Sequence, residues 1–118
     1  MSTRSDGQLA ERRAAKFLEE NYGYKILTMN YACRLGEVDI IAEEAGILCF
    51  VEVRTRTTSK YGEAIESISP QKRRRIALTA HHFIVTKGFN NHACRFDVVT
   101  IQDRGEPQLL KNAFNMTD

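Results

Sequence analysis

The sequence predicts an α/β fold in which helices pack on one mixed central β-sheet. The predicted elements run in the order helix, three strands, helix, and one or two further strands. Such an arrangement is typical of a sheet flanked by helices. The 118 residues suffice for one modest core, and they contain no internal repeat or low-complexity segment. We therefore expect a single domain over residues 1–118, with an ordered core from about 6 to 114.

The first predicted element is a helix from Asp6 to about Asn21. Ser5 or Asp6 can cap its N-terminus, and Gly23 supplies a stop after the last turn. Apolar residues recur at helical spacing and form one stripe, made of Ala10, Ala14, Phe17 and Leu18 with Ala15 at its edge. Glu11 lies in line with this stripe, so its carboxylate is directed near the core side. It is either a functional carboxylate or a rim carboxylate bonded to a nearby arginine.

A strand and a loop are predicted to follow this helix. Residues 24–29 have the β-branched and aromatic character of a strand, and residues 30–36 are predicted to form a loop. Arg34 lies in this loop. It is either a contact for a phosphate group or an exposed surface arginine.

The centre of the chain predicts two strands joined by a tight turn. Residues 37–42 and 47–54 are rich in β-branched and aromatic side chains. If Ala45-Gly46 is a two-residue turn, Glu44 pairs with Ile47 and the register of the whole hairpin follows. We interpret this hairpin as the element around which the rest of the chain is arranged.

The predicted register places the carboxylates of Asp39 and Glu52 directly opposite each other. Like charges in that position repel, and a divalent cation between them would turn the repulsion into a metal site, because Mg²⁺ takes carboxylate oxygens as ligands. The same register pairs Glu37 with Arg54. The alternative is a solvated sheet face that carries the Glu37–Arg54 pair and leaves the other two carboxylates in water.

A polar stretch and a second helix follow the hairpin. Residues 57–62 show no period, and we interpret them as a loop beside the site. Ser69 followed by Pro70 is a strong helix start, and this helix is predicted to run to about Thr86, before Gly88 stops it. The remaining predicted segments are a strand at 95–101, a turn at 103–107 and a short last strand at 108–114.

Charge and cysteine content limit the class of protein. The net charge of +2 does not by itself indicate a polyanionic partner, but the basic residues cluster after the hairpin and in the second helix. Candidate contacts for a nucleic-acid backbone are Arg34, Arg56, Lys60, Lys72, Arg73 and Arg74. The alternative for the helical run is a solvated face. Three cysteines without CxxC spacing and the lack of an apolar membrane span favour a reducing, cytoplasmic setting and no membrane partner.

Five blocks of the sequence carry a family resemblance: Gly7 with Glu11, Gly36–Ala42, Phe50–Arg56, Lys72–Arg74 and Arg95–Val98. Together they resemble the PD-(D/E)xK nuclease superfamily. They are more similar to one branch of it, the YraN family of small bacterial proteins related by fold to archaeal Holliday junction resolvases. They cover nearly the whole chain from Gly7 to Ile101, and they imply a restriction-endonuclease-like core.

The resemblance also implies a set of functional residues. Asp39 and Glu52 would bind Mg²⁺ or Mn²⁺, with the backbone carbonyl of Val53 and the carboxylate of Glu11 as further ligands. Arg54 stands where the superfamily motif has lysine. An arginine is not deprotonated in proteins, so Arg54 cannot act as a general base and would instead stabilise charge on the phosphate.

Three functions are consistent with the sequence. The first is a metal-dependent endonuclease that hydrolyses DNA, at branched or single-stranded structures, with Glu37 supporting Arg54. The second is a non-catalytic DNA-binding or adaptor protein that retains the nuclease fold. The third is a structural protein with a wet, charged sheet face, which would bind neither metal nor DNA. The resemblance to resolvases further suggests a homodimer.

Overall fold

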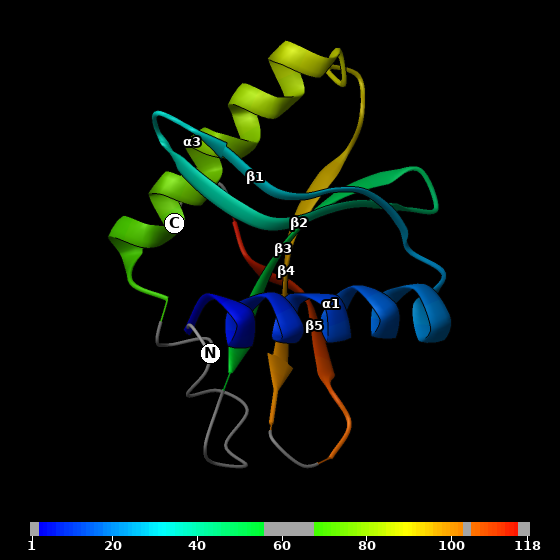
Figure 1. Ribbon diagram of the computed structural model, residues 1–118. Helices are drawn as coiled ribbons and strands as arrows, with labels where there is room; N and C mark the ends of the chain where they lie inside the picture. The colour runs from blue at the N-terminus through cyan, green and yellow to red at the C-terminus, as the bar shows by residue number, and fades with distance from the viewer. Residues whose placement is uncertain (1–2, 56–67, 103–104, 116–118) are drawn as a thin grey trace.

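The computed structural model describes residues 3–55, 68–102 and 105–115, which form a five-stranded mixed sheet between two helices (Figure 1). In chain order the elements are α1 (Thr3–Tyr22), β1 (Lys25–Cys33), β2 (Gly36–Glu44), β3 (Ile47–Thr55), α3 (Pro70–Lys87), β4 (Cys94–Ile101) and β5 (Gln108–Phe114). The strands lie side by side in the order β1-β2-β3-β4-β5. All neighbours are antiparallel except β3 and β4, which are parallel and are connected through α3. The predicted α/β class is confirmed. Arg56, Lys60 and the predicted loop at 57–62 lie outside the described residues.

Each face of the sheet has its own core. On one face, Phe83 of α3 packs with Phe50 and Phe96 of the central strands. On the other face, Ala14 and Leu18 of α1 are fully buried, as the apolar stripe predicted. Full burial of one large apolar side chain contributes about 1.5–3 kcal/mol, so these two clusters hold the helices against the sheet.

Helix α1 begins earlier than predicted. It starts at Thr3, so Ser5 and Asp6 lie within its first turns and the prediction that one of them is the cap was wrong. Serine and aspartate are favourable both at a cap and in the first turn, so the sequence alone does not distinguish these positions. The helix ends as predicted before Gly23, whose φ is 71°. The amide of the next residue donates to the carbonyl of Leu18 at 3.1 Å, which closes the helix end.

Strand β1 is longer than predicted, and most of the predicted loop at 30–36 belongs to strands. The pairing of β1 with β2 continues to Cys33 opposite Gly36, which leaves a two-residue turn. Asn30 has a φ of 54°, and this residue type tolerates such a backbone better than most. The polar residues in this segment suggested a loop, but hydrogen bonding to β2 makes it a strand.

The central hairpin has the predicted turn. Ala45 and Gly46 both have positive φ, 51° and 83°, as a tight two-residue hairpin turn requires. Glu44 lies opposite Ile47, so the predicted register is confirmed at this end. The described pairing stops at Ile40 opposite Val51, one step before the predicted pairing of Asp39 with Glu52.

Helix α3 has the predicted ends. Ser69 is its N-cap, and its hydroxyl accepts a hydrogen bond from the Lys72 amide at 3.1 Å. Pro70 occupies the first helical position, and Gly88, with a φ of 79°, caps the C-terminus. This cap fixes the first turn of α3, which carries Lys72, beside the sheet.

The buried carboxylate of Asp97 connects several elements of the fold through hydrogen bonds. Asp97 is fully buried and accepts hydrogen bonds from the Tyr24 hydroxyl at 2.7 Å, Arg95 Nε at 2.9 Å and the Asn112 amide at 2.9 Å. Arg95 also donates to Glu44 at 2.6 Å. Burial and then the bond to Asp97 raise the pKa of Tyr24 far above its ordinary value, so its hydroxyl remains a donor. The network therefore joins β2, β4, β5 and the segment after α1.

We predict that Asp97→Ala lowers the free energy of unfolding by about 3–5 kcal/mol, because it leaves Arg95 and the Tyr24 hydroxyl without their buried acceptor. Urea denaturation at pH 7 measures the change. Glu43→Gln, which removes a half-exposed carboxylate that faces His92 at 3.6 Å, is the control and should cost less than about 1 kcal/mol. Equal stability of the two variants would contradict the importance of this network.

Candidate active site

The candidate site begins where β2 and β3 separate. Beyond Ile40 and Val51 the described ladder ends, and the Val53 amide donates to Asp39 Oδ2 at 2.9 Å. An aspartate side chain thus accepts a hydrogen bond from the neighbouring strand. Since the N–H and C=O of one strand residue point to the same side, the Val53 carbonyl is also directed toward β2.

The alternation of side chains along β2 changes at Asp39. Val38 packs with Ile41 in the core on the α3 face, whereas Ile40 packs with Ala42 in the core on the α1 face. In a regular strand Val38 would share a face with Ile40. The irregularity at Asp39 lies beside Asn30, the left-handed residue of β1. The regular alternation of side chains on which the predicted pairing of Asp39 with Glu52 depends therefore does not hold at this residue.

Glu52 is the buried carboxylate of the site. It is 3% exposed, it lies on β3, and its Oε2 is 3.4 Å from Nζ of Lys72 in the first turn of α3. Burial is the main reason why the pKa of Glu52 rises to about 8, and the negative charge of Asp39 adds to the increase. Lys72 opposes both effects. The two carboxylates are thus close enough to repel, as the sequence analysis expected.

Glu11 approaches the same site from α1. Burial raises the pKa of Glu11, and the charge of Asp39 and a hydrogen bond with its carboxylate raise it further. The Asn30 side chain, which also bonds to Glu11, has the opposite effect. Two carboxyl groups form a hydrogen bond only when they share a proton, and a divalent cation can take the place of that proton. Glu11 therefore lies beside Asp39, with the Asn30 side chain as its other neighbour.

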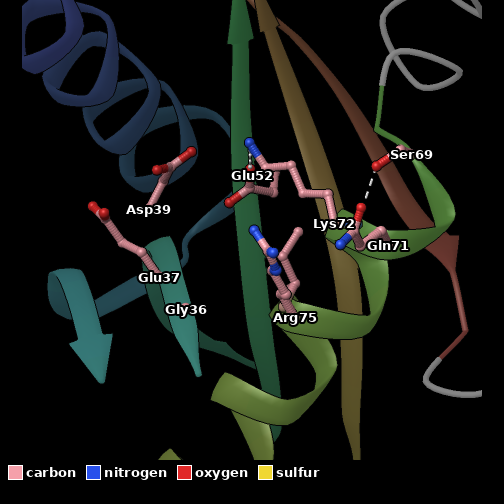
Figure 2. A pocket seen from close by; sticks show the side chains of 9 residues that line it. Gly36, Glu37, Asp39, Glu52, Ser69, Gln71, Lys72 and Arg75 are labelled. Atoms are coloured by element: carbon pink, nitrogen blue, oxygen red, sulfur yellow. Dashed lines mark hydrogen bonds and ion pairs between the residues drawn. The ribbon is translucent and has the colours of Figure 1, made fainter. Parts of the chain in front are cut away.

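Between the strands and α3 lies a cavity of about 340 Å³. Asp39 and Glu52 line it from the sheet and Lys72 and Arg75 from α3, as Figure 2 shows. The full set of lining residues is Gly36, Glu37, Asp39, Glu52, Ser69, Gln71, Lys72, Arg75 and Ile76. Arg54 is not among the described residues that line it. The cavity has an acidic wall and a basic wall, an arrangement that suits a cation bound next to an anionic ligand.

Gly36 allows α3 to approach β2 at this cavity. A Cβ atom at this residue would lie 3.0 Å from Thr79 Oγ1 and 3.4 Å from the Arg75 carbonyl, and the φ of Gly36 is 156°. A side chain at this position would crowd Thr79 and Arg75 of α3 and strain the backbone at this φ. Sequence reasoning did not assign this role, although a glycine directly before the predicted strand at 37–42 is the signal that could have suggested a close approach.

The predicted nucleic-acid contacts lie in different places. Arg34 is exposed in the turn between β1 and β2, and Arg74 is exposed on α3. Arg73 is held against the protein, because its Nε donates to the Ile68 carbonyl at 3.0 Å and its guanidinium lies 5.7 Å from the Phe114 ring centre. Only Lys72 of the predicted contacts lines the cavity within the described part of the chain, where it is joined by Arg75, which the sequence analysis missed. Arg75 follows Lys72 by three helical positions, so the helical period could have revealed it.

The donor set at the site fits a small divalent cation. Mg²⁺ is usually held by one or two carboxylates, with waters and phosphate oxygens completing its coordination. Asp39 and Glu52 meet this minimum, and their mutual repulsion would be relieved by a cation. Residues 3–55, 68–102 and 105–115 contain no group of three or more histidine, cysteine or acidic side chains arranged to hold a metal. All three cysteines are free thiols, and burial raises the pKa of Cys49 to about 12, which keeps it protonated.

Comparison with known proteins establishes the family. The family described as "Uncharacterised protein family UPF0102" matches residues 10–101. The chain belongs to this family. UPF0102 is the YraN family, so the resemblance drawn from the sequence is confirmed.

Relatives of this UPF0102 chain match over most of their length. A UPF0102 protein of Lachnoclostridium phytofermentans is 45% identical and covers 98% of this chain and 97% of its own. One from Syntrophus aciditrophicus is 41% identical over 93% of this chain and 88% of its own. One from Pelotomaculum thermopropionicum is 43% identical over 80% of this chain and 78% of its own.

Neither helix in the described part of the chain is both long and apolar enough to cross a membrane.

We predict that the metal-free protein loses stability as the pH rises from about 4.5 to 8, and that Glu52→Gln reduces this loss. The raised pKa of Glu52 means that the folded state holds its proton more tightly than the unfolded state across this window, so stability decreases as the proton is lost. Thermal melts in EDTA between pH 5 and 9 measure the effect.

Glu19→Gln on the exposed side of α1 is the matched control, and its melting temperature should follow the wild-type pH profile. If the profiles of Glu52→Gln and Glu19→Gln ran parallel, the folded-state pKa of Glu52 would not be raised.

Proposed function

We propose that this protein is an endonuclease that requires Mg²⁺ or Mn²⁺ and hydrolyses phosphodiester bonds in DNA. The observation that supports it best is the convergence of Asp39 and Glu52, from two adjacent strands, on one cavity that also has a basic wall. The resemblance to branched-DNA resolvases extends the proposal to branched or single-stranded substrates and to a homodimer, which sedimentation can check.

In this proposal the acidic side chains hold the cation. Asp39 and Glu52 would be the main ligands and the Val53 carbonyl a backbone ligand, and Glu11, which lies beside Asp39, would move toward the cation as a further ligand when it binds. When bound, such a cation activates water and neutralises charge on the phosphate. The bond from the water oxygen to phosphorus forms as the bond from phosphorus to one sugar oxygen breaks; the attacking water gives up a proton to solvent, and the departing sugar oxygen takes one up from solvent to leave as a hydroxyl group.

The basic side chains bind and orient the substrate. Arg75 lines the cavity next to the acidic groups and is suited to a phosphate oxygen. Arg54 follows Glu52 by two residues and contributes positive charge, but it cannot accept the proton of the attacking water. Arg34 and Arg74 are exposed and can contact the backbone further from the cleaved bond. Such contacts position DNA without reading its sequence.

A non-catalytic DNA-binding protein is the second candidate. One observation favours it, namely that Glu52 already has a cationic neighbour, the Lys72 ammonium group at 3.4 Å. A scaffold that keeps this ion pair and binds DNA through its arginines would need no metal. The two functions differ in whether a cation binds and whether DNA is cut.

We predict that wild-type protein binds Mn²⁺ and Mg²⁺ and that Asp39→Asn abolishes this binding. The amide is neutral, so it neither repels Glu52 nor attracts a cation. Calorimetric titration of each metal measures binding, and labelled four-way junction and single-stranded DNA measure cleavage. Loss of the cation should reduce the cleavage rate by about 10²-fold or more, since metal ions supply several kcal/mol of transition-state stabilisation.

Glu43→Gln removes one carboxylate from the far end of the same strand, and it should bind metal and cut DNA as the wild type does. DNA binding should be similar in all three proteins. Metal-independent DNA binding with no cleavage by the wild type would reject the nuclease and establish the second candidate.

A further inference from the structure

Lys72 occupies a distinctive place in the site. Its side chain is 45% exposed, whereas the Glu52 side chain that it contacts is 4% exposed. The lysine therefore reaches from the surface into the cavity, and Figure 2 shows it extending from the first turn of α3 toward Glu52. Its backbone is fixed by Ser69 and by Pro70, so the ammonium group is delivered from a rigid helix end.

The positive charges of two basic side chains, Arg54 and Lys72, act on Glu52, but the two side chains are placed differently. Arg54 belongs to the same strand as Glu52 but does not line the cavity, whereas Lys72 lines it together with both carboxylates. Within the described residues Lys72 is the one lysine that does so. An ammonium group is a compact point charge with three donors, which suits the oxygens of a phosphate.

A divalent cation at this site must compete with Lys72. The ammonium group is 3.4 Å from Glu52 Oε2, and a cation that takes Glu52 as a ligand needs the same carboxylate. A divalent cation bound to Glu52 would lie close to the Lys72 ammonium group, and two positive charges close together in a partly buried site repel strongly. If Glu52 became a metal ligand, Lys72 would therefore lose its partner, and its flexible stem could then reach a neighbouring phosphate oxygen.

We propose that Lys72 is a catalytic residue of this site, which leaves Glu52 when the divalent cation binds and then stabilises negative charge on the phosphate. Lys72 would thus provide, from α3, the lysine that β3 lacks because Arg54 stands there. The inference rests on the proposed nuclease function. It makes a prediction that a purely structural role does not make, because removing the lysine should strengthen metal binding while slowing cleavage.

The test compares Lys72→Met and Lys72→Arg with Lys87→Met, which makes the same lysine-to-methionine change in the exposed last turn of α3. Calorimetry without DNA measures Mn²⁺ affinity. Single-turnover cleavage at saturating Mn²⁺ measures the rate. We expect Lys72→Met to bind Mn²⁺ about two- to fivefold more tightly, the scale of partly exposed ion pairs. We expect its cleavage rate to fall by about 10²-fold, as when one donor to a transition-state oxyanion is removed. Lys72→Arg should recover part of the rate, and Lys87→Met should match the wild type.

Three outcomes would overturn the inference. Cleavage by Lys72→Met at the rate of Lys87→Met would do so while leaving the nuclease function intact. Weaker metal binding together with a lower melting temperature would show that Lys72 only supports Glu52. If the wild type cuts no DNA, the proposed function fails by itself, and equal Mn²⁺ affinity of Lys72→Met and Lys87→Met would then also reject the exchange at Glu52.

Discussion

Two buried carboxylates on adjacent parallel strands impose the main physical constraint on this fold. Asp97 of β4 lies opposite Val51, and Glu52 is the next residue of β3. A charge taken out of water destabilises the folded state unless other groups compensate it. Asp97 receives that compensation from a tyrosine, an arginine and a backbone amide. Glu52 instead faces a cavity, with a lysine at 3.4 Å and another carboxylate nearby. The first carboxylate stabilises the sheet, and the second is available for chemistry.

The site lies where the regular pairing of β2 with β3 stops. The ladder between β2 and β3 ends at Ile40 and Val51, and the next residue of β2 uses its side chain to accept a β3 amide. Gly36 then allows α3 to pack close to β2. The rigid β-sheet and the capped start of α3 therefore face each other across a small cavity. Functional groups on rigid elements are positioned more precisely than groups on loops.

Family membership and fold alone do not establish an activity, since one fold can support many functions. The argument for a nuclease depends on the chemistry of the cavity: carboxylates whose repulsion a cation relieves, and basic residues opposite them. The position of each side chain relative to the cavity also distinguishes the roles of the basic residues in the first turns of α3. Lys72 and Arg75 face the cavity, whereas Arg73 is held by Ile68 and Phe114. A count of positive charges in the sequence cannot make this distinction, because direction around a helix decides it.

Local sequence signals determined the elements whose ends are set by neighbouring residues. The Ala45-Gly46 turn, the Ser69-Pro70 start of α3 and its Gly88 end depend on backbone preferences of those residues, and each was predicted. The apolar stripe of α1 and the two carboxylates of the hairpin were also readable. The length of β1, the change of face at Asp39 and the approach of Lys72 to Glu52 were decided only by the tertiary structure. Each of these depends on pairing or packing with another element of the fold, and that interaction outweighs local preference.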